Sequence, residues 1–425
     1  MKKVLLSVLV LAMCFSFAFA AEKQTIIYPD DNIDFTFQPT FSRYNAMGQS
    51  GLAAAGRMDS FYTNPAALAE ERFGLSLPTV AVTLFNVQKL VSDPEAMTIV
   101  NSMIDGTADD NAAVNLADKM IKNLGSGYNT LATIDAGVGA AFGSFGLGAN
   151  VQVKLHTLAK GSSNVANVKV IPEVNVAQTV ALGLNIIKTD ALKLQIGAAG
   201  HFVYKAYLQG QDAATVSSLL SDDDGSDVQK KLLWNTPTMG GYAIPVDLGV
   251  TLSLANDAVR LSATANNLNG TYRMSSYDSF ANMTNSVVGT EVFTPEEGYE
   301  AKESEKFEIK TPWTLNFGFA FAPNVIFKPV ITADLIDMLG MVKGLGSDSF
   351  KAEDLLLHLN AGAEVSILCF NLRAGVNRGY MSVGAGVGLL GMRIDATYGW
   401  QEFGAELGDK PVDSFTIRFN LGYDK

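Results

Sequence analysis

Apolar and polar residues alternate along most of the chain, and the alternation is clearest near the C-terminal end. Between Phe415 and Tyr423 every second residue is apolar, while Thr416, Arg418 and Asn420 lie between them. Strict alternation predicts an extended strand with two unlike faces, because successive side chains of a strand point to opposite sides. The apolar face of this strand therefore packs either against the core of a soluble β protein or against lipid.

The same alternation recurs in fourteen segments, which is an even number. The predicted strands cover residues 73–85, 132–142, 145–156, 172–186, 191–206, 240–255, 258–272, 311–322, 326–335, 357–367, 369–377, 380–389, 391–400 and 414–423. The joint between the segments ending at 367 and beginning at 369 lacks a typical turn residue. The pattern predicts an all-β fold.

The connections between these strands alternate in length. Most connections after even-numbered strands are tight; they lie at 144, 188–190, 256–257, 323–324 and 390. Most of the other connections are long, at 86–131, 157–171, 207–239, 273–310, 336–356 and 401–413. The short connection at 378–379 is the exception among them. Bacterial outer-membrane barrels sort their loops in this way, with short periplasmic turns and long external loops. We therefore predict a transmembrane antiparallel β-barrel of about 14 strands over 73–425 with long extracellular loops, closed because lipid offers the backbone no hydrogen bonds. A soluble secreted β protein or surface antigen is the alternative.

The first twenty residues have the form of a secretory signal peptide. Lys2 and Lys3 precede an apolar run that ends at Ala18, Phe19 and Ala20, which suits a signal-peptidase site. Residues 1–20 are therefore predicted to be a signal peptide, and the cell outer membrane is the predicted location. A lipoprotein anchored through Cys14 is the alternative. Beyond residue 20, no apolar run is long enough for a transmembrane helix.

Composition and charge agree with a membrane barrel. Charged residues make up 17% of the chain and apolar residues 48%, which is a less charged composition than that of average soluble proteins. The formal net charge of -12 argues against a nucleic-acid partner, since such partners require basic patches.

The chain lacks the common motifs of catalytic and metal sites. After the predicted signal peptide, His156, His201 and His358 are far apart in sequence and Cys369 is the only cysteine. HExxH, CxxC, GxSxG and Walker motifs are absent, so we expect no enzyme activity, no metal and no cofactor. The acidic segment 221–227 does not match an EF-hand loop; it is either a solvated loop tip or a calcium ligand.

The long loops also contain a helix signal. Asp93 followed by Pro94 reads as an N-cap with proline in the first turn. Apolar residues then recur at helical spacing at 114, 117, 121 and 124. This stretch either packs on its neighbours or covers the barrel mouth and gathers a hydrophobic substrate.

Charged residues at inward positions of the predicted strands are the candidate lumen residues. Five of them are basic: Lys154, Lys193, Arg373, Arg393 and Arg418. They either orient a carboxylate ligand or form ion pairs with Asp247, Glu364, Asp395 or the segment that fills the lumen. Glycines in the strands fall into two groups with different expected roles. Gly384, Gly386 and Gly388 would make room for that segment, and Gly137, Gly139 and Gly146 would kink the wall.

Residues 21–72 precede the first strand and are rich in small residues. The run MGQSGLAAAGRMDSFYTNPAALA, which contains Asn64, Pro65 and Ala66, resembles the N-terminal signature of the FadL-type outer-membrane transporters, including their spirochaetal members. Locally, Asn-Pro also reads as a simple turn before the first strand. The resemblance covers about 25 residues.

This resemblance implies a function as well as a fold. In that family residues 21–72 would form a hatch inside a fourteen-stranded barrel, with Asn64, Pro65 and Ala66 in the hatch. The implied function is passive uptake of hydrophobic small molecules such as long-chain fatty acids, by a monomer whose cargo leaves sideways through the wall. The alternative is an assembly or secretion role with an outer-membrane protein partner and no transport.

Overall fold

The computed structural model describes eleven stretches of the chain and three single residues. These are residues 36–54, 60–70, 72–108, 112, 115–116, 119, 127–159, 168–208, 211–212, 234, 237–294, 305–346, 351–404 and 406–424. The predicted signal peptide, the segment 221–227 and the apolar positions 114, 117, 121 and 124 lie outside the described residues.

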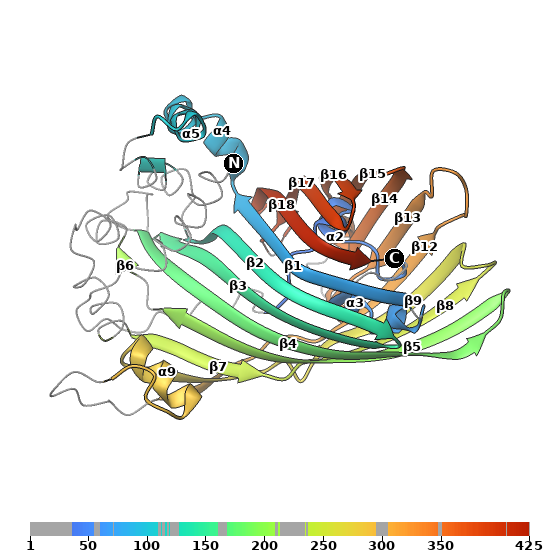
Figure 1. Ribbon diagram of the computed structural model, residues 1–425, viewed down its shortest axis with the longest axis horizontal. Helices are drawn as coiled ribbons and strands as arrows, with labels where there is room; N and C mark the ends of the chain where they lie inside the picture. Colours follow the sequence, from blue (N-terminus) through green and yellow to red (C-terminus); the bar gives the residue numbers. More distant parts are fainter. Residues whose placement is uncertain are drawn as a thin grey trace.

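The strands form one closed antiparallel barrel (Figure 1). The ring closes where β1 (Arg72–Phe85) pairs with both β2 (Gly127–Gly143) and β18 (Pro411–Asp424). The other uninterrupted strands are β3 (Phe145–Ala159), β4 (Val168–Lys188), β5 (Leu192–Leu208), β13 (Val330–Leu335), β14 (Leu359–Ile367), β15 (Phe370–Asn377), β16 (Tyr380–Leu389) and β17 (Met392–Glu402). A two-residue strand, β6 (Gln211–Asp212), extends the pairing of β4.

Three further positions in the ring are each occupied by two short strands. They are β7 (Thr238–Ala243) with β8 (Val246–Leu254), β9 (Val259–Leu268) with β10 (Tyr272–Tyr277), and β11 (Lys306–Ile309) with β12 (Thr314–Phe321). Both β7 and β8 pair with β5, so each pair of segments counts as one strand of the wall. The barrel thus has fourteen strands, which confirms the prediction.

The breaks correct the prediction of continuous strands over 240–255 and 258–272. β12 lies within the strand predicted over 311–322, whereas β11 lies in the predicted loop 273–310 and was missed. Pro245 and Pro312 lack the backbone N–H that a sheet ladder needs, and each lies at a break. The freed carbonyl groups are instead bonded to side chains: the Asn269 amide donates to Ile244 O (3.0 Å), and the Asn267 amide donates to Pro312 O (2.8 Å). The three breaks lie on neighbouring strands and form one bend across the wall.

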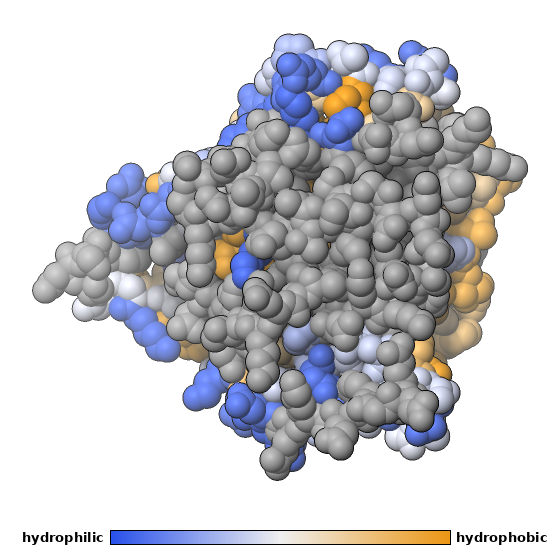
Figure 2. All heavy atoms as spheres, turned by 90° about the vertical axis from the view of Figure 1, so that its left-hand side faces the viewer, coloured by the Kyte–Doolittle hydropathy of each residue, from blue (hydrophilic) through white to orange (hydrophobic). Residues whose placement is uncertain are grey.

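Along most of the wall the polar face of the strands points into the barrel and the apolar face points outward. Parts of β4, β5, β7 and β10 are exceptions, because they bury apolar residues such as Tyr207, Tyr272 and Met274 in one cluster. On β18, Thr416 and Arg418 are buried, whereas Ile417 is 48% exposed and Phe419 and Leu421 are also exposed. Other strands repeat this pattern, and Figure 2 shows orange, hydrophobic wall at the edge of the view. This arrangement is the reverse of a water-soluble protein, whose apolar residues are inside.

Short helices lie in the long connections. They are α4 (Val87–Val91), α5 (Pro94–Asp105), α9 (Phe280–Val288), α10 (Met338–Leu345) and the 3-10 helix η3 (Ala352–His358). The predicted helix start is confirmed, since the Asp93 carboxylate accepts hydrogen bonds from the backbone N–H groups of Glu95 (3.0 Å) and Ala96 (3.2 Å). None of the helices in the described part of the chain is long and apolar enough to traverse a membrane.

Candidate functional site

The N-terminal segment, residues 36–54 and 60–70, lies in the lumen and touches both sides of the wall. It contains α2 (Ser42–Ala46), α3 (Ser60–Thr63) and the 3-10 helix η1 (Pro65–Glu70), and strands surround α2 and α3 in Figure 1. η1 packs on β4, β5 and β8, whereas α2 packs on β15, β16 and β17. We call these two stretches the lumen segment.

A row of three glycines seats η1 on the wall. Gly183, Gly197 and Gly249 are direct neighbours across β4, β5 and β8. A Cβ at Gly197 would lie 2.5 Å from Pro65 O, and one at Gly183 would lie 2.5 Å from Ala69 N. Backbone can approach backbone this closely only where no side chain stands between.

The Asn-Pro-Ala motif of the resemblance lies at this contact. Asn64 is 1% exposed, and its amide donates to Leu52 O (2.7 Å) and to Thr251 Oγ1 (2.9 Å) on β8. Its own Oδ1 accepts from the backbone N–H of Ala66 (3.1 Å). Asn64 therefore ties together the two parts of the lumen segment and the wall, and Pro65 and Ala66 rest on the glycine row.

A second glycine row seats the other end of the lumen segment. Gly362 and Gly375 pair with each other across β14 and β15. A Cβ added at Gly362 would lie 2.7 Å from Met47 Cβ, and one added at Gly375 would lie 2.6 Å from Met47 O. Gly384 faces Ala46 Cβ, as its predicted role requires. The sequence reasoning missed Gly362 and Gly375, although both stand at inward positions of alternating strands.

The other strand glycines have different neighbours from those expected. Gly386 faces the carboxylate of Asp395, and a Cβ on Gly388 would approach only residues 392 and 393, at 3.9 and 4.0 Å, among the described residues. Gly146 receives the ring of Phe61. Gly386 and Gly388 therefore do not contact the lumen segment as predicted, and Gly146 makes room for a ring of that segment instead of kinking the wall.

The tight seat of η1 gives a testable expectation. Gly197→Ala places a methyl group against the backbone of residues 65 and 66, so we expect a loss of about 1–3 kcal/mol of stability and easier proteolysis of the lumen segment. Gly200→Ala on the same strand is the matched control, because no described heavy atom lies within 4 Å of its Cβ position. Denaturant unfolding and limited proteolysis of the purified proteins measure both effects. Equal stability and equal proteolysis of the two variants would contradict the close contact between η1 and Gly197.

A chain of alternating charges links the other side of the lumen segment to the wall. Glu364 on β14 accepts from Arg43 Nε of α2 (3.1 Å) and from Arg373 Nε of β15 (2.5 Å). Arg373 Nη1 donates to Asp395 Oδ1 (2.7 Å), and Arg393 Nε donates to Asp395 Oδ2 (2.8 Å). Two of the predicted basic residues, Arg373 and Arg393, thus belong to one network, and Arg43 is a member that the sequence reasoning missed.

The other three predicted basic residues have other contacts, although Arg418 lies directly across from Asp395 where β17 pairs with β18. Lys154 Nζ is 4.0 Å from Glu173 Oε1. Lys193 pairs with Asp257 of the β8–β9 turn, so it lies at the rim rather than in the centre of the lumen, because β5 begins only one residue earlier. Arg418 lies 5.5 Å from the ring centroid of Phe41.

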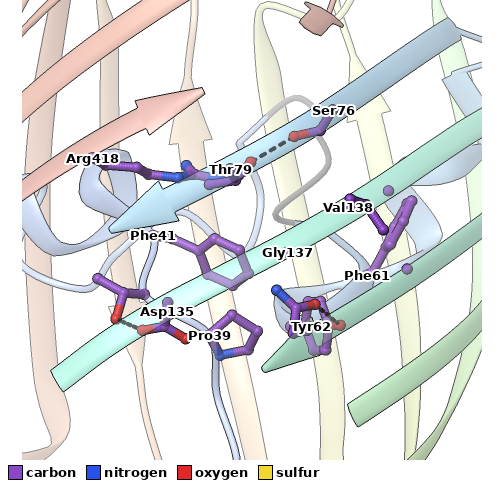
Figure 3. A pocket seen from close by; sticks show the side chains of 14 residues that line it. Pro39, Phe41, Phe61, Tyr62, Ser76, Thr79, Asp135, Gly137, Val138 and Arg418 are labelled. Carbon is purple, nitrogen blue, oxygen red and sulfur yellow. Dashed lines mark hydrogen bonds between the residues drawn. The ribbon is translucent and has the colours of Figure 1, made fainter. Parts of the chain in front are cut away.

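A small cavity separates the lumen segment from the wall at β1, β2 and β3. Aromatic rings of the lumen segment (Phe41, Phe61, Tyr62) face wall residues that include Gly137, Val138, Gly139, Asp135 and Arg418 (Figure 3). Its volume is about 40 Å³, which holds roughly three water molecules. The cavity is mostly apolar, with one cation and one carboxylate at its margin.

Tyr62 and Thr40 fix the lumen segment beside this cavity. The Tyr62 hydroxyl donates to Asn150 Oδ1 (2.6 Å) and accepts from Thr179 Oγ1 (2.9 Å). Burial raises the pKa of Tyr62 to about 12, so the hydroxyl stays protonated and remains a donor at neutral pH. The Thr40 hydroxyl donates to the carboxylate of Asp135.

The wall is irregular beside the cavity. β1 changes register between Ser76 and Thr79, opposite Gly139 and Gly137 of β2, and the register shifts against both of its neighbours. The predicted kink at the glycines is thus corrected: the bulge lies in β1, where Pro78 cannot donate to the ladder. Two of the three predicted glycines, Gly137 and Gly139, line the cavity opposite the bulge.

No family model and no curated protein matches the sequence. Among solved structures, the chain is similar to the toluene transporter TodX of Pseudomonas putida (11% identity, TM-score 0.44, 92% of this chain and 99% of that one). It is also similar to a FadL homologue of Pseudomonas aeruginosa, with 11% identity and a TM-score of 0.41 over 92% of this chain and 99% of that one. A third similar structure is CdiB of Acinetobacter baumannii, with 8% identity and a TM-score of 0.32 over 83% of this chain and 60% of that one. One of these solved structures is thus a homologue of FadL, which gives its name to the family that the sequence resembles.

Proposed function

We propose that this protein is an outer-membrane channel for the passive uptake of hydrophobic small molecules. The observation that carries the proposal is the aromatic cavity between the lumen segment and the bulged strand β1. The apolar outer face of the barrel suits lipid, and the predicted signal peptide, residues 1–20, suits export. The lumen segment acts as the hatch in this proposal.

Transport requires the hatch to move. A cavity of about 40 Å³ is too small for a hydrocarbon of several carbons, so the ligand enters only when the lumen segment shifts. The hydrogen bonds of Tyr62 and Thr40 hold the closed position on the cavity side. Once the segment has moved, the bulge at Ser76–Thr79 provides the exit, because the regular pairing of β1 is already interrupted there.

Long-chain fatty acids are the proposed ligands. An acyl chain would pack among Phe41, Phe61 and Tyr62, and its carboxylate would meet Arg418 at the margin of the cavity. Arg418 lines the cavity and its guanidinium lies over the ring of Phe41, so Arg418 is the residue we propose to orient the head group. The protein is proposed to act as a monomer.

Uptake of a labelled long-chain fatty acid by transporter-deficient cells tests the proposal. Cells that make the protein should take up the label faster than cells that do not. Gly148→Leu should return uptake to background, because Gly148 lines the cavity and a Cβ there has no neighbour closer than 3.5 Å, so the side chain fills the cavity without moving the backbone. Gly200→Leu, away from the cavity, is the matched control. Equal uptake with and without the protein would reject transport and favour the assembly or secretion role.

A further inference from the structure

The turns at the short-loop end of the barrel divide into two contiguous groups. The β2–β3, β4–β5 and β8–β9 turns carry small or polar residues at their tips, including Ser144, Asp190, Asn256 and Asp257. The next three turns around the ring carry large apolar residues at their tips: Ile326 between β12 and β13, Leu368 between β14 and β15, and Leu390 between β16 and β17. These three tips are 85%, 98% and 89% exposed.

The apolar tips continue the apolar outer face of the wall. Ile367 and Phe370 flank Leu368, Leu389 and Met392 flank Leu390, and all four are exposed. On β4, by contrast, the apolar face ends at Ile187, and the charged Lys188 is the last residue of the strand before the turn. Exposed apolar patches of this extent on a folded protein mark a contact with another phase or molecule.

The backbone of two tips makes leucine an unusual choice in water. Leu368 and Leu390 have φ of 54° and 51°, a left-handed conformation that glycine and asparagine adopt far more readily. The polar β8–β9 turn follows that rule, with Asn256 and Asp257 at φ of 55° and 67°. In water, leucine at such a position raises the free energy of the folded protein in two ways: its backbone conformation is strained and its apolar side chain is exposed.

Strand length points to lipid as the contact. β13, β14 and β15 have six, nine and eight residues. At a rise of about 3.3 Å per residue and a tilt of about 40°, such strands span roughly 15–23 Å, less than the apolar band of about 25 Å that membrane barrels present. β4 and β5, with 21 and 17 residues, exceed that band. Figure 1 shows β13–β15 on the short side of the wall and β4–β5 on the long side.

We propose that the three apolar turns lie within the acyl region of the membrane, so that the short wall spans the bilayer only together with its turns. Ile326, Leu368 and Leu390 then contact lipid chains, while the β4–β5 and β8–β9 turns remain in water. The barrel consequently sits tilted, or the bilayer thins beside the short wall. This inference rests on the membrane placement in the proposed function but not on transport.

Lipid quenching of single-cysteine variants tests the placement. Starting from Cys369→Ser, we would introduce Ile326→Cys, Leu368→Cys or Leu390→Cys, with Asp190→Cys as the polar-turn control and Ile417→Cys as the lipid-facing reference. Each purified protein is labelled with bimane and reconstituted into nanodiscs of brominated phosphatidylcholine. We expect strong quenching at 326, 368, 390 and 417 and weak quenching at 190.

Two outcomes separate the failure of this inference from the failure of the membrane placement. Quenching at 417 but not at the three tips would overturn the inference and leave the barrel in the membrane. If the three tips are not quenched in nanodiscs but are protected from maleimide in intact cells, the patch contacts a protein partner, and this outcome also overturns the inference. Lack of quenching at 417 would reject the membrane placement itself.

Discussion

Uptake of a hydrophobic probe is expected to stop when a disulfide joins the lumen segment to β13. Ser50 Oγ and Thr332 Oγ1 lie 2.5 Å apart, and both residues are buried. A Ser50→Cys, Thr332→Cys variant in the Cys369→Ser background therefore brings two sulfur atoms close to bonding distance, about 2.05 Å. Because the proposed transport requires the segment to move, cells that make the oxidised variant should take up the probe no faster than cells without the protein.

Reversal and matched controls make this experiment specific. Reduction with dithiothreitol should restore uptake, and each single-cysteine variant should transport in both redox states. A second disulfide, Ser366→Cys with Asn371→Cys, joins β14 to β15 within the wall, where these residues pair directly, and should leave uptake unchanged. Full uptake by the oxidised Ser50–Thr332 variant would show that this part of the lumen segment does not move during transport.

The strands of the barrel were predictable because each is a local pattern. Alternation fixes which residues face outward without knowledge of any partner strand, so Ile417 and its neighbours are assigned correctly from the chain alone. The uncertain joint before Cys369 is also a true turn, since Leu368 adopts positive φ without a glycine. The bend across β7 to β12 was missed, although Pro245 and Pro312 were visible signals against continuous strands.

The contacts of the lumen segment were not predictable in the same way. Arg43 and Glu364 are 321 residues apart in sequence, and alternation shows that Glu364 faces inward without showing what it meets. The glycine rows depend on register: Gly183, Gly197 and Gly249 align only after the pairings of β4, β5 and β8 are known. Lys193 faces inward by pattern, yet its position beside a turn places it at the rim.

Glu364→Gln is expected to weaken the anchor of the lumen segment and the barrel together. The side chain is 3% exposed and its carboxylate accepts from both Arg43 and Arg373. Removing this negative charge leaves the buried Arg373 guanidinium with Asp395 alone, in a network that then holds three cations and one anion. We expect a loss of about 3 kcal/mol in free energy of unfolding, the scale of breaking a buried ion pair.

Denaturant unfolding in lipid vesicles measures this loss, and Glu406→Gln is the matched control. Glu406 forms an exposed pair with Lys351 (3.3 Å) far from the lumen, so its neutralisation should not measurably change stability. Adding Arg43→Gln to Glu364→Gln should cost less than Arg43→Gln alone, because the two side chains share one interaction. Additive costs would instead mean that Arg43 stabilises the segment independently of Glu364. Since Arg43 is the member of this network that belongs to the lumen segment, non-additivity would identify their contact as the ionic tie between hatch and wall.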